Sequence, residues 1–313
     1  MINEQECAEL LSAHDHFLIL THRNPDGDTA GSAGALCRIL RRLGKTAYLY
    51  PNPQFTPKLS AFISDLSAPD GYRFAYIVAV DVASESQLPQ NFEGSVDLCI
   101  DHHGSNTSYA GAVLVEAEKA SCAEVVYHLS RLLAGGPSPV EATLLYLGLS
   151  TDCGCFRFSN TKAETFQAAA DLASCGAEID RVNELFFRRS SRGRLKLEGM
   201  IYSGMRFEMN DRVAAAFITP ELIRQCGADE DDCSNLASLP VQAEGVDLGV
   251  TIKDSGDGTC RVSLRSGDKV NSNEICAVFG GGGHVRAAGC SIPGSPDEVY
   301  ETLMQVIREK LDS

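Results

Sequence analysis

Short apolar segments that each end in aspartate or histidine constrain the fold of this chain more than any other feature. Phe17–Leu20 is followed after one residue by His22, and residues 75–80 are followed directly by Asp81. Residues 96–100 lead into an Asp-His-His run. In an open α/β sheet, functional groups gather at the carboxyl ends of the strands. We therefore expect these segments to be neighbouring strands whose ends share one crevice.

Helical segments alternate with these strands in the first half of the chain. This alternation predicts an α/β fold with a parallel sheet that carries helices on both faces. We expect a further strand at residues 46–50, and helices at residues 28–43, 121–133, 139–149 and 161–174.

The second half of the chain differs in character, and the 313 residues are enough for two domains. We expect residues 1–180 to form the larger α/β domain, residues 181–204 a basic helical linker, and residues 205–313 a smaller C-terminal α/β domain. In the last part we expect strands at residues 213–218, 246–252 and 259–264, and helices at residues 273–279 and 296–311.

Composition limits the classes of partner and compartment. The formal net charge of −15 argues against a protein that coats long duplex nucleic acid, because such binding requires a basic surface. No apolar run approaches the ~20 residues of a membrane span, and the acidic first residues do not resemble a secretory signal. The 12 cysteines fit no zinc-site spacing, so we interpret them as free thiols. These observations predict a cytoplasmic protein that acts on a small anionic substrate away from membranes.

The turn after the first strand adds carboxylates to the crevice. His22, Asp26 and Asp28 lie across a turn that contains proline and glycine, and such a turn can aim several side chains at one point. Asp152 follows the helix expected at residues 139–149. Each residue alone could be a loop cap, an N-cap or part of a solvated turn. Their ordered recurrence after apolar segments instead predicts a two-metal hydrolase site, since Mn²⁺ accepts both carboxylate and imidazole.

A glycine-rich stretch marks the C-terminal part. Four consecutive glycines precede His284 and Arg286. Exposed backbone N–H groups in such a stretch can bind an anion, as in phosphate-binding nests. The residues alone are equally compatible with a flexible loop before a strand, so both interpretations stay open at this point.

In combination, these residues resemble the DHH phosphoesterase superfamily, which is named for the Asp-His-His run. The matching motifs are His22-x3-Asp26-x-Asp28, Val80-Asp81, Asp101-His102-His103 and Thr151-Asp152. The resemblance implies two divalent cations, with Mn²⁺ favoured over Mg²⁺ because of the histidine ligands. It implies a bridging role for Asp81 and the following metal ligands: His22, Asp26, Asp28, Asp81, His102 and Asp152.

The resemblance also implies roles beyond the ligands. His103 would face the substrate phosphate and protonate the leaving oxygen, and Asp101 would orient the histidines. The glycine-rich stretch is similar to the DHH-associated C-terminal domain, which binds nucleic-acid substrate. The implied substrate contacts are Arg265, Gly281, Gly282, Gly283, His284 and Arg286.

The two-domain form resembles the nanoRNase branch of this superfamily. It implies hydrolysis of short oligoribonucleotides and of adenosine 3′,5′-bisphosphate (pAp), and it leaves a homodimer open. The alternatives are a cyclic- or linear-dinucleotide phosphodiesterase, a RecJ-like single-strand exonuclease, and an exopolyphosphatase-related hydrolase. A nucleotide-binding sensor without turnover is the non-enzyme alternative. The residues do not decide the preferred substrate, the direction of chain attack, or Mn²⁺ against Mg²⁺.

Overall fold

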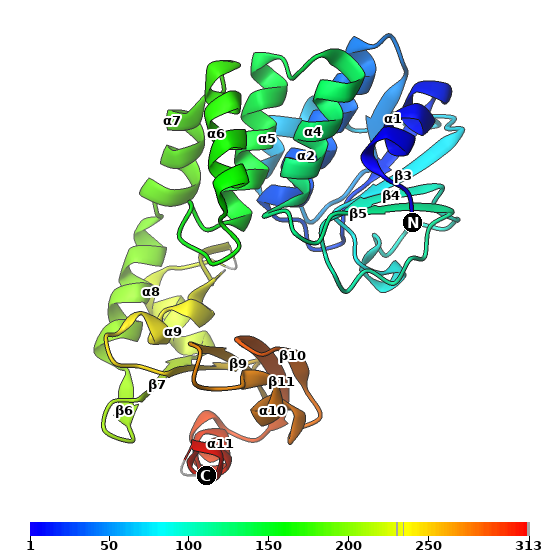
Figure 1. The fold of residues 1–313 in the computed structure, drawn as a ribbon. Coiled ribbons are helices and arrows are strands. Elements are labelled where there is room, and N and C mark those ends of the chain that lie inside the picture. Colours follow the sequence, from blue (N-terminus) through cyan, green and yellow to red (C-terminus); the bar gives the residue numbers. More distant parts are fainter. Residues whose placement is uncertain (230, 234, 312–313) are drawn as a thin grey trace. The chain divides into compact units, whose positions relative to one another are not determined.

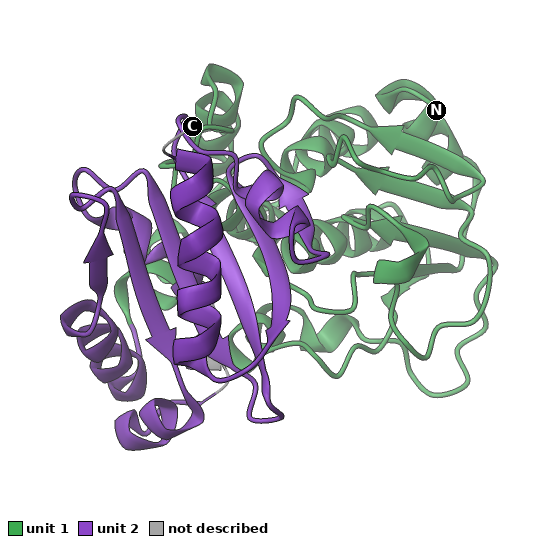
Figure 2. Cartoon of the chain, turned by 90° about the horizontal axis from the view of Figure 1, so that it is seen from below, with its two compact units in different colours: residues 1–189 green, residues 190–313 purple. Residues whose placement is uncertain are grey.

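The chain folds into two compact units, each with its own hydrophobic core. The computed structural model describes residues 1–229, 231–233 and 235–311, and the units comprise Met1–Arg189 and Ser190–Ser313 (Figure 2). The first unit holds the polar strand ends, and the second holds the glycine-rich stretch.

The first unit is built on a parallel sheet with the strand order β2-β1-β3-β4-β5. Figure 1 labels β3, β4 and β5 of this sheet. Its aliphatic strands are buried on both faces, which is typical of parallel sheets. The strands are β1 (Phe17–Leu20), β2 (Ala47–Leu49), β3 (Tyr76–Val80), β4 (Leu98–Asp101) and β5 (Ala112–Val115).

One face of this sheet packs against helices. Phe17 and Ile19 point into the same core as residues of α1, α2, α4 and α5. The helices are α1 (Glu4–Ala13), α2 (Gly27–Arg42), α3 (Pro57–Ile63), α4 (Cys122–Ala134), α5 (Pro139–Asp152), α6 (Ala163–Ser174) and α7 (Ile179–Asn183). A π-helical turn, η3 (Glu184–Arg188), ends the unit.

The other face of the sheet differs from the prediction in one respect. Leu18 and Ile77 point to this side, where they pack with Leu88, Val96 and the half-buried Phe92. These partners come from the irregular chain between β3 and β4, which contains the short turn η2 (Glu85–Gln87), rather than from a layer of helices. The α/β class and the parallel sheet are confirmed, but helix packing on both faces was wrong in this detail. Large apolar side chains on an irregular segment can cover a sheet as a helix would.

Two glycines let α2 and α5 cross at unusually short range. A Cβ atom at Gly31 would lie 2.4 Å from the carbonyl oxygen of Leu144, and one at Gly148 would lie 2.8 Å from Oδ1 of Asp28. A side chain at either position would separate the helices. The contact brings the C-terminal end of α5 next to the first turn of α2.

The second unit is built on a mixed sheet with the strand order β10-β11-β9-β8-β7-β6, in which only the β7–β8 pair is parallel among the described residues. The strands are β6 (Arg206–Glu208), β7 (Val213–Ile218), β8 (Leu248–Asp254), β9 (Thr259–Ser266), β10 (Gly282–His284) and β11 (Ala287–Pro293). The helices are α8 (Arg192–Ser203), α9 (Pro220–Cys226), α10 (Ser272–Ala277) and α11 (Pro296–Leu311), with short turns η4 (Asp231–Cys233), η5 (Leu236–Ser238) and η6 (Pro240–Gln242).

The basic segment after residue 180 contains the end of α7, the turn η3 and the helix α8, and its role as a linker stays a prediction. Leu197 and Ile201 of α8 pack with Ala216 and Ile218 of β7, so this helix belongs to the core of the second unit. The chain therefore passes between the units at Arg189 and Ser190.

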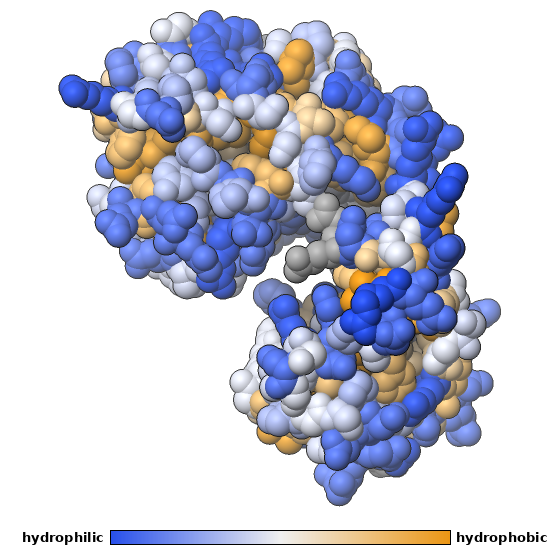
Figure 3. All heavy atoms as spheres, turned by 180° about the vertical axis from the view of Figure 1, so that it is seen from behind, coloured by the Kyte–Doolittle hydropathy of each residue, from blue (hydrophilic) through white to orange (hydrophobic). Residues whose placement is uncertain are grey.

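The visible surface is largely polar (Figure 3). Figure 3 shows a mostly hydrophilic face with scattered hydrophobic side chains. Among the described residues, no helix is both long enough and apolar enough to cross a membrane.

Candidate metal centre

Histidine and aspartate side chains from four parts of the first unit converge at the carboxyl edge of its sheet. They come from the loop after β1, the residue after β3, the end of β4 with the loop that follows, and the end of α5. Because the strands are parallel, their carboxyl ends lie along one edge. Asp152 reaches this edge from a helix, since α5 includes it as its last residue.

The donor atoms form three overlapping groups, of which one joins His103 to Asp81 and His102 and the other two contain the predicted ligands. In the first of these two, Nε2 of His22 lies 3.6 Å from Oδ1 of Asp26 and 3.7 Å from Oδ2 of Asp81. In the second, Nε2 of His102 lies 3.7 Å from Oδ2 of Asp28, 3.7 Å from Oδ1 of Asp81 and 3.6 Å from Oδ2 of Asp152. Asp81 thus presents one oxygen to each group.

These distances test whether the residues fit two divalent cations. They are too long for hydrogen bonds. They exceed by only a few tenths of an ångström the roughly 3–3.5 Å between two donors on one ion with bonds of about 2.1 Å, so a small inward shift of the side chains would bring both onto an ion. In addition, Oδ1 of Asp81 is buried and has no hydrogen-bond partner among the described residues. A buried carboxylate oxygen without a partner is costly unless a cation accompanies it. The donor set therefore fits divalent cations bound beside Asp81.

Asp81 is strained as well as buried. It is 3% exposed, and its φ of 61° lies in the left-handed region that residues other than glycine rarely adopt. Burial, together with repulsion from Asp28 and other carboxylates, raises its pKa well above the ordinary value. Strain and uncompensated charge of this kind are typical of functional sites.

Asp28 and Asp26 are held by the ends of helices. The Asp28 carboxylate accepts the backbone N–H groups of Cys122 (2.7 Å) and Ala123 (2.9 Å) at the start of α4. Burial nevertheless raises its pKa. Asp26 is the N-cap of α2 and accepts the N–H groups of Asp28 and Thr29. Asp26 is therefore both the helix cap that its position suggests and a member of the donor set.

Backbone and carboxylate partners orient the two adjacent histidines. Nδ1 of His102 lies 3.3 Å from the carbonyl oxygen of Lys119, which leaves Nε2 to face the carboxylates. Nδ1 of His103 lies 2.8 Å from Oδ1 of Asp101, and this contact raises the pKa of His103. Burial acts to raise the pKa of Asp101, but hydrogen bonds from His103 and Asn106 hold it below the ordinary value. His103 is half exposed, with Nε2 left available.

Asn106 and Asn160 are supporting residues that the sequence did not single out as site residues. Nδ2 of Asn106 donates to Oδ2 of Asp101 at 2.7 Å. Nδ2 of Asn160 donates to the carbonyl oxygens of Ala120 (2.9 Å) and Asp152 (3.3 Å). The pair Asn160-Thr161, which follows α5 in the sequence, is the one signal that could have pointed to Asn160. Nothing in the sequence distinguished Asn106.

The carboxyl group of Asp152 has a strongly raised pKa. Burial first, and then the negative charges of Asp28 and Asp26, raise its pKa to about 8. Carboxylates this close repel one another until a cation joins them. The cavity above the donors has a volume of about 340 Å³ and is also lined by Arg23, Asn24 and Gln87.

Three of the predicted substrate residues of the second unit form a strand at one edge of its sheet. Gly282, Gly283 and His284 form the exposed strand β10, which pairs with β11. Gly283 has a φ of 150°, and a Cβ atom there would lie 2.5 Å from the carbonyl oxygen of Ala287. At Gly281, a Cβ atom would lie 2.3 Å from the carbonyl oxygen of Gly289. The glycines thus permit a close backbone pairing, and their role in anion binding stays a prediction.

The two predicted arginines of this unit differ in environment. Arg286 is exposed and forms an ion pair with Asp268. Arg265 lies in β9, and partial burial lowers the pKa of its guanidinium. Their contacts with substrate also stay predictions.

Comparison with known proteins finds a family match for each of the two units. The N-terminal domain of the DHH family matches residues 16–149, and the DHHA1 domain matches residues 210–313. The chain is 34% identical to the bifunctional oligoribonuclease and PAP phosphatase NrnA of Thermus thermophilus, over 97% of this chain and 93% of the relative. It is 27% identical to the protein of the same name from Bacillus subtilis, over 92% of each chain.

A solved structure shares the fold. The exopolyphosphatase-related protein of Bacteroides fragilis matches with a TM-score of 0.87 and 22% identity, over 99% of this chain and 97% of that one. At this level of identity, the likeness supports the architecture alone.

Proposed function

The chain belongs to the DHH family of phosphoesterases, and we propose that it hydrolyses short oligoribonucleotides and pAp at the Asp81 centre. The shared carboxylate of Asp81, with one oxygen facing each donor group, is the observation that carries this proposal. The proposed substrate class, short RNA and pAp, comes from the relatives that are named bifunctional oligoribonuclease and PAP phosphatase.

We assign the proposed ligands to two cations by the donor groups in which they lie. His22 and Asp26 would hold one ion, and Asp28, His102 and Asp152 the other, with Asp81 contributing to both. We propose Mn²⁺ over Mg²⁺, because imidazole suits Mn²⁺ better. When bound, the ions would activate water and offset the charge that develops on the phosphoryl oxygens.

His103 is the proposed proton donor. Its Nδ1 is engaged by Asp101, so Nε2 is the nitrogen that can deliver a proton to the leaving oxygen. The raised pKa of His103 keeps a larger share of the ring protonated near neutral pH. Asp101 acts on the reaction by positioning, since it holds the His103 ring and also accepts the backbone N–H of His102. Asn106 supports Asp101 in turn.

A single site can hydrolyse both pAp and a short oligoribonucleotide if the P–O3′ bond breaks in each. In pAp, a water oxygen bonds to the 3′-phosphorus, the P–O3′ bond breaks, and O3′ takes a proton to give AMP and phosphate. In a dinucleotide such as pApA, the same attack gives AMP and a second 5′-nucleotide. The leaving group is identical, and only the substituent on the phosphoryl group differs.

The cysteines support the proposed compartment. All 12 are free, and most are buried. Free thiols fit a reducing compartment, so we propose the cytoplasm, where short RNA fragments arise.

The function is tested by side-by-side hydrolysis with Mn²⁺ of a 5′-labelled RNA trimer, pAp and cyclic di-AMP. We expect the wild-type protein to consume the trimer and pAp, and Asp81→Ala to consume neither. Turnover of cyclic di-AMP alone would assign the protein to the cyclic-dinucleotide phosphodiesterases. Tight binding without turnover of any of the three would indicate a sensor.

A further inference from the structure

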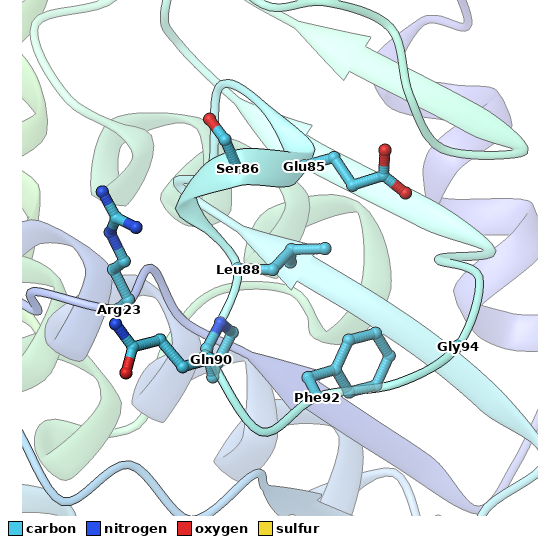
Figure 4. Close-up of a pocket in the computed structure, with 8 residues that line it drawn as sticks. Arg23, Glu85, Ser86, Leu88, Gln90, Phe92 and Gly94 are labelled. Carbon is cyan, nitrogen blue, oxygen red and sulfur yellow. The ribbon is translucent and has the colours of Figure 1, made fainter.

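A second cavity lies next to the metal centre in the first unit. It has a volume of about 320 Å³ and is lined by Arg23 from the loop after β1 and by seven residues of the segment 85–94, which follows β3 (Figure 4). The lining side chains include Phe92, Leu88, Gln90 and Glu85. None of these residues belongs to the metal donor set.

Arg23 and the η2 turn connect this cavity to the metal centre. Arg23 lines both cavities. Its backbone N–H donates to the carbonyl oxygen of Gln87 at 2.7 Å, which holds the loop after β1 against the turn. Gln87 lines the metal cavity, whereas its neighbour Ser86 lines the second one. A ligand that extends past the Arg23 side chain from one cavity into the other would occupy both.

The lining of the second cavity suits a nucleoside. Phe92 is half buried, and its ring meets that of Tyr50 edge-on at 5.7 Å between centroids. The Tyr50 hydroxyl donates to the carbonyl oxygen of Asn91 at 2.8 Å, so the segment that carries Phe92 is held in place. A fixed aromatic ring can stack on a base of any sequence, and Gln90 can hydrogen-bond to it.

The charges favour a base and ribose over a second phosphate. Arg23, at the side shared with the metal centre, is the only cationic residue among those that line the cavity. Glu85 adds a negative charge. A phosphate deep in the cavity would face this carboxylate, whereas a phosphate at the metal centre would lie within reach of Arg23.

We propose that this cavity is the subsite for the nucleoside carried by the phosphoryl group under attack. This inference rests on the proposed function, because the phosphoryl group must sit at the Asp81 centre. In pApA that group carries a nucleoside, but in pAp it carries none. The pocket therefore favours oligonucleotides over pAp, and it makes Phe92 and Gln90 specificity residues.

The ratio of kcat/KM for pApA to kcat/KM for pAp tests the subsite, because only pApA fills it. We expect Phe92→Ala to lower this ratio about tenfold, since stacking on one aromatic ring contributes about that much. Gln90→Ala should lower it by a smaller factor, and Gln90 is exposed, so its loss leaves the core intact.

Phe74→Ala is the matched control. Phe74 is an aromatic residue of the same unit that is more exposed than Phe92, and it precedes β3 and so lies at the amino edge of the sheet, away from the metal centre. An unchanged ratio in Phe74→Ala with a lowered ratio in Phe92→Ala and Gln90→Ala supports the subsite. An unchanged ratio in both pocket variants, with melting temperatures near that of the wild type, overturns it.

Failure of the proposed function would be recognised separately. If the wild-type protein hydrolyses neither substrate, equilibrium binding of 5′-AMP in the presence of Mn²⁺ replaces the kinetic ratio. Weaker binding by Phe92→Ala than by Phe74→Ala would then still support the nucleoside subsite. Equal binding by the two variants would reject it.

Discussion

At the scale of single residues, Asp81 is the residue on which the proposed metal centre depends most. It is buried, its backbone is strained, and Oδ1 has no hydrogen-bond partner within the described chain. None of these features benefits a metal-free protein. They are understandable if the carboxylate is kept ready for two cations, since their charge offsets the cost of burial.

The first prediction concerns Asp81→Asn, which removes the charge and keeps the shape. Without metal at pH 8, we expect the variant to melt about 3–6 °C above the wild type, because a repelled buried charge is gone. With Mn²⁺ the order should reverse, since the variant loses the shared ligand. Thermal unfolding with EDTA and with Mn²⁺ measures both. A metal-free variant that melts below the metal-free wild type would contradict the account.

The second prediction concerns pH. The pKa of Asp152 is raised to about 8, and those of Asp28 and Asp81 are also raised, so the folded metal-free protein binds more protons than the unfolded chain. Its stability should therefore fall as pH rises from about 4 to about 8. We expect a fall in melting temperature on the order of 5 °C between pH 6 and pH 8 in EDTA.

Added Mn²⁺ provides the control for the pH dependence. Protons and cations compete for the same carboxylates, so the stabilisation by Mn²⁺ should be larger at pH 8 than at pH 6. A metal-free protein that becomes more stable over this interval would show that these carboxylates are not the groups that titrate.

At the scale of elements, helix ends position the donors that the strands do not. The start of α4 holds Asp28, the start of α2 is capped by Asp26, and the end of α5 carries Asp152. The close crossing of α2 and α5 at Gly31 and Gly148 brings two of these ends together. Helix packing therefore sets the geometry of the centre as much as the sheet does.

The third prediction tests this crossing with Gly148→Ala. The new Cβ would lie 2.6 Å from Cβ of Ala123 and 2.8 Å from Oδ1 of Asp28. We expect a loss of about 1–3 kcal/mol in the free energy of unfolding. Mn²⁺ affinity should also fall, because Asp28 must move. Chemical denaturation and calorimetric metal titration measure the two effects.

Gly199→Ala is the matched control for the helix crossing. Gly199 lies inside α8, and a Cβ atom there would meet nothing within 4 Å among the described atoms. Greater helix propensity should stabilise this variant by up to about 1 kcal/mol, with Mn²⁺ affinity unchanged. If both variants behaved alike, close packing at Gly148 would not be the cause.

At the scale of the whole molecule, the two units have separate cores and separate chemistry. The metal donors all belong to Met1–Arg189, and the glycine-rich strand belongs to Ser190–Ser313. The core of the first unit is built on a parallel sheet, and that of the second on a mixed sheet. Metal binding should therefore stabilise the first unit directly.

The fourth prediction follows for the full chain. Scanning calorimetry in EDTA should resolve two transitions, and Mn²⁺ should raise one of them by several degrees. Asp81→Asn should abolish this shift. A single transition that moves as a whole with Mn²⁺ would show that the two units unfold cooperatively.

Much of the fold and of the candidate site could be predicted because both depend on local pattern. The strand Phe17–Leu20 was predicted with its observed bounds, and the helix expected at residues 28–43 is α2 (Gly27–Arg42). Apolar periodicity and end signals carry that information. Short edge strands such as β5 and β6 were missed, because their few residues carry little pattern. The glycine-rich stretch could not be read as strand β10, since its pairing partner β11 defines it.

By itself, the sequence determined the α/β class, the family, and which histidines and aspartates could serve as ligands, since these depend on residue type and order along the chain. Only the tertiary structure decided which donors face one another. It made Asp81 the carboxylate common to both groups, gave Asn106 a role behind His103, and set a second cavity beside Arg23. Distances between segments far apart in the chain arise from packing, which no local pattern encodes.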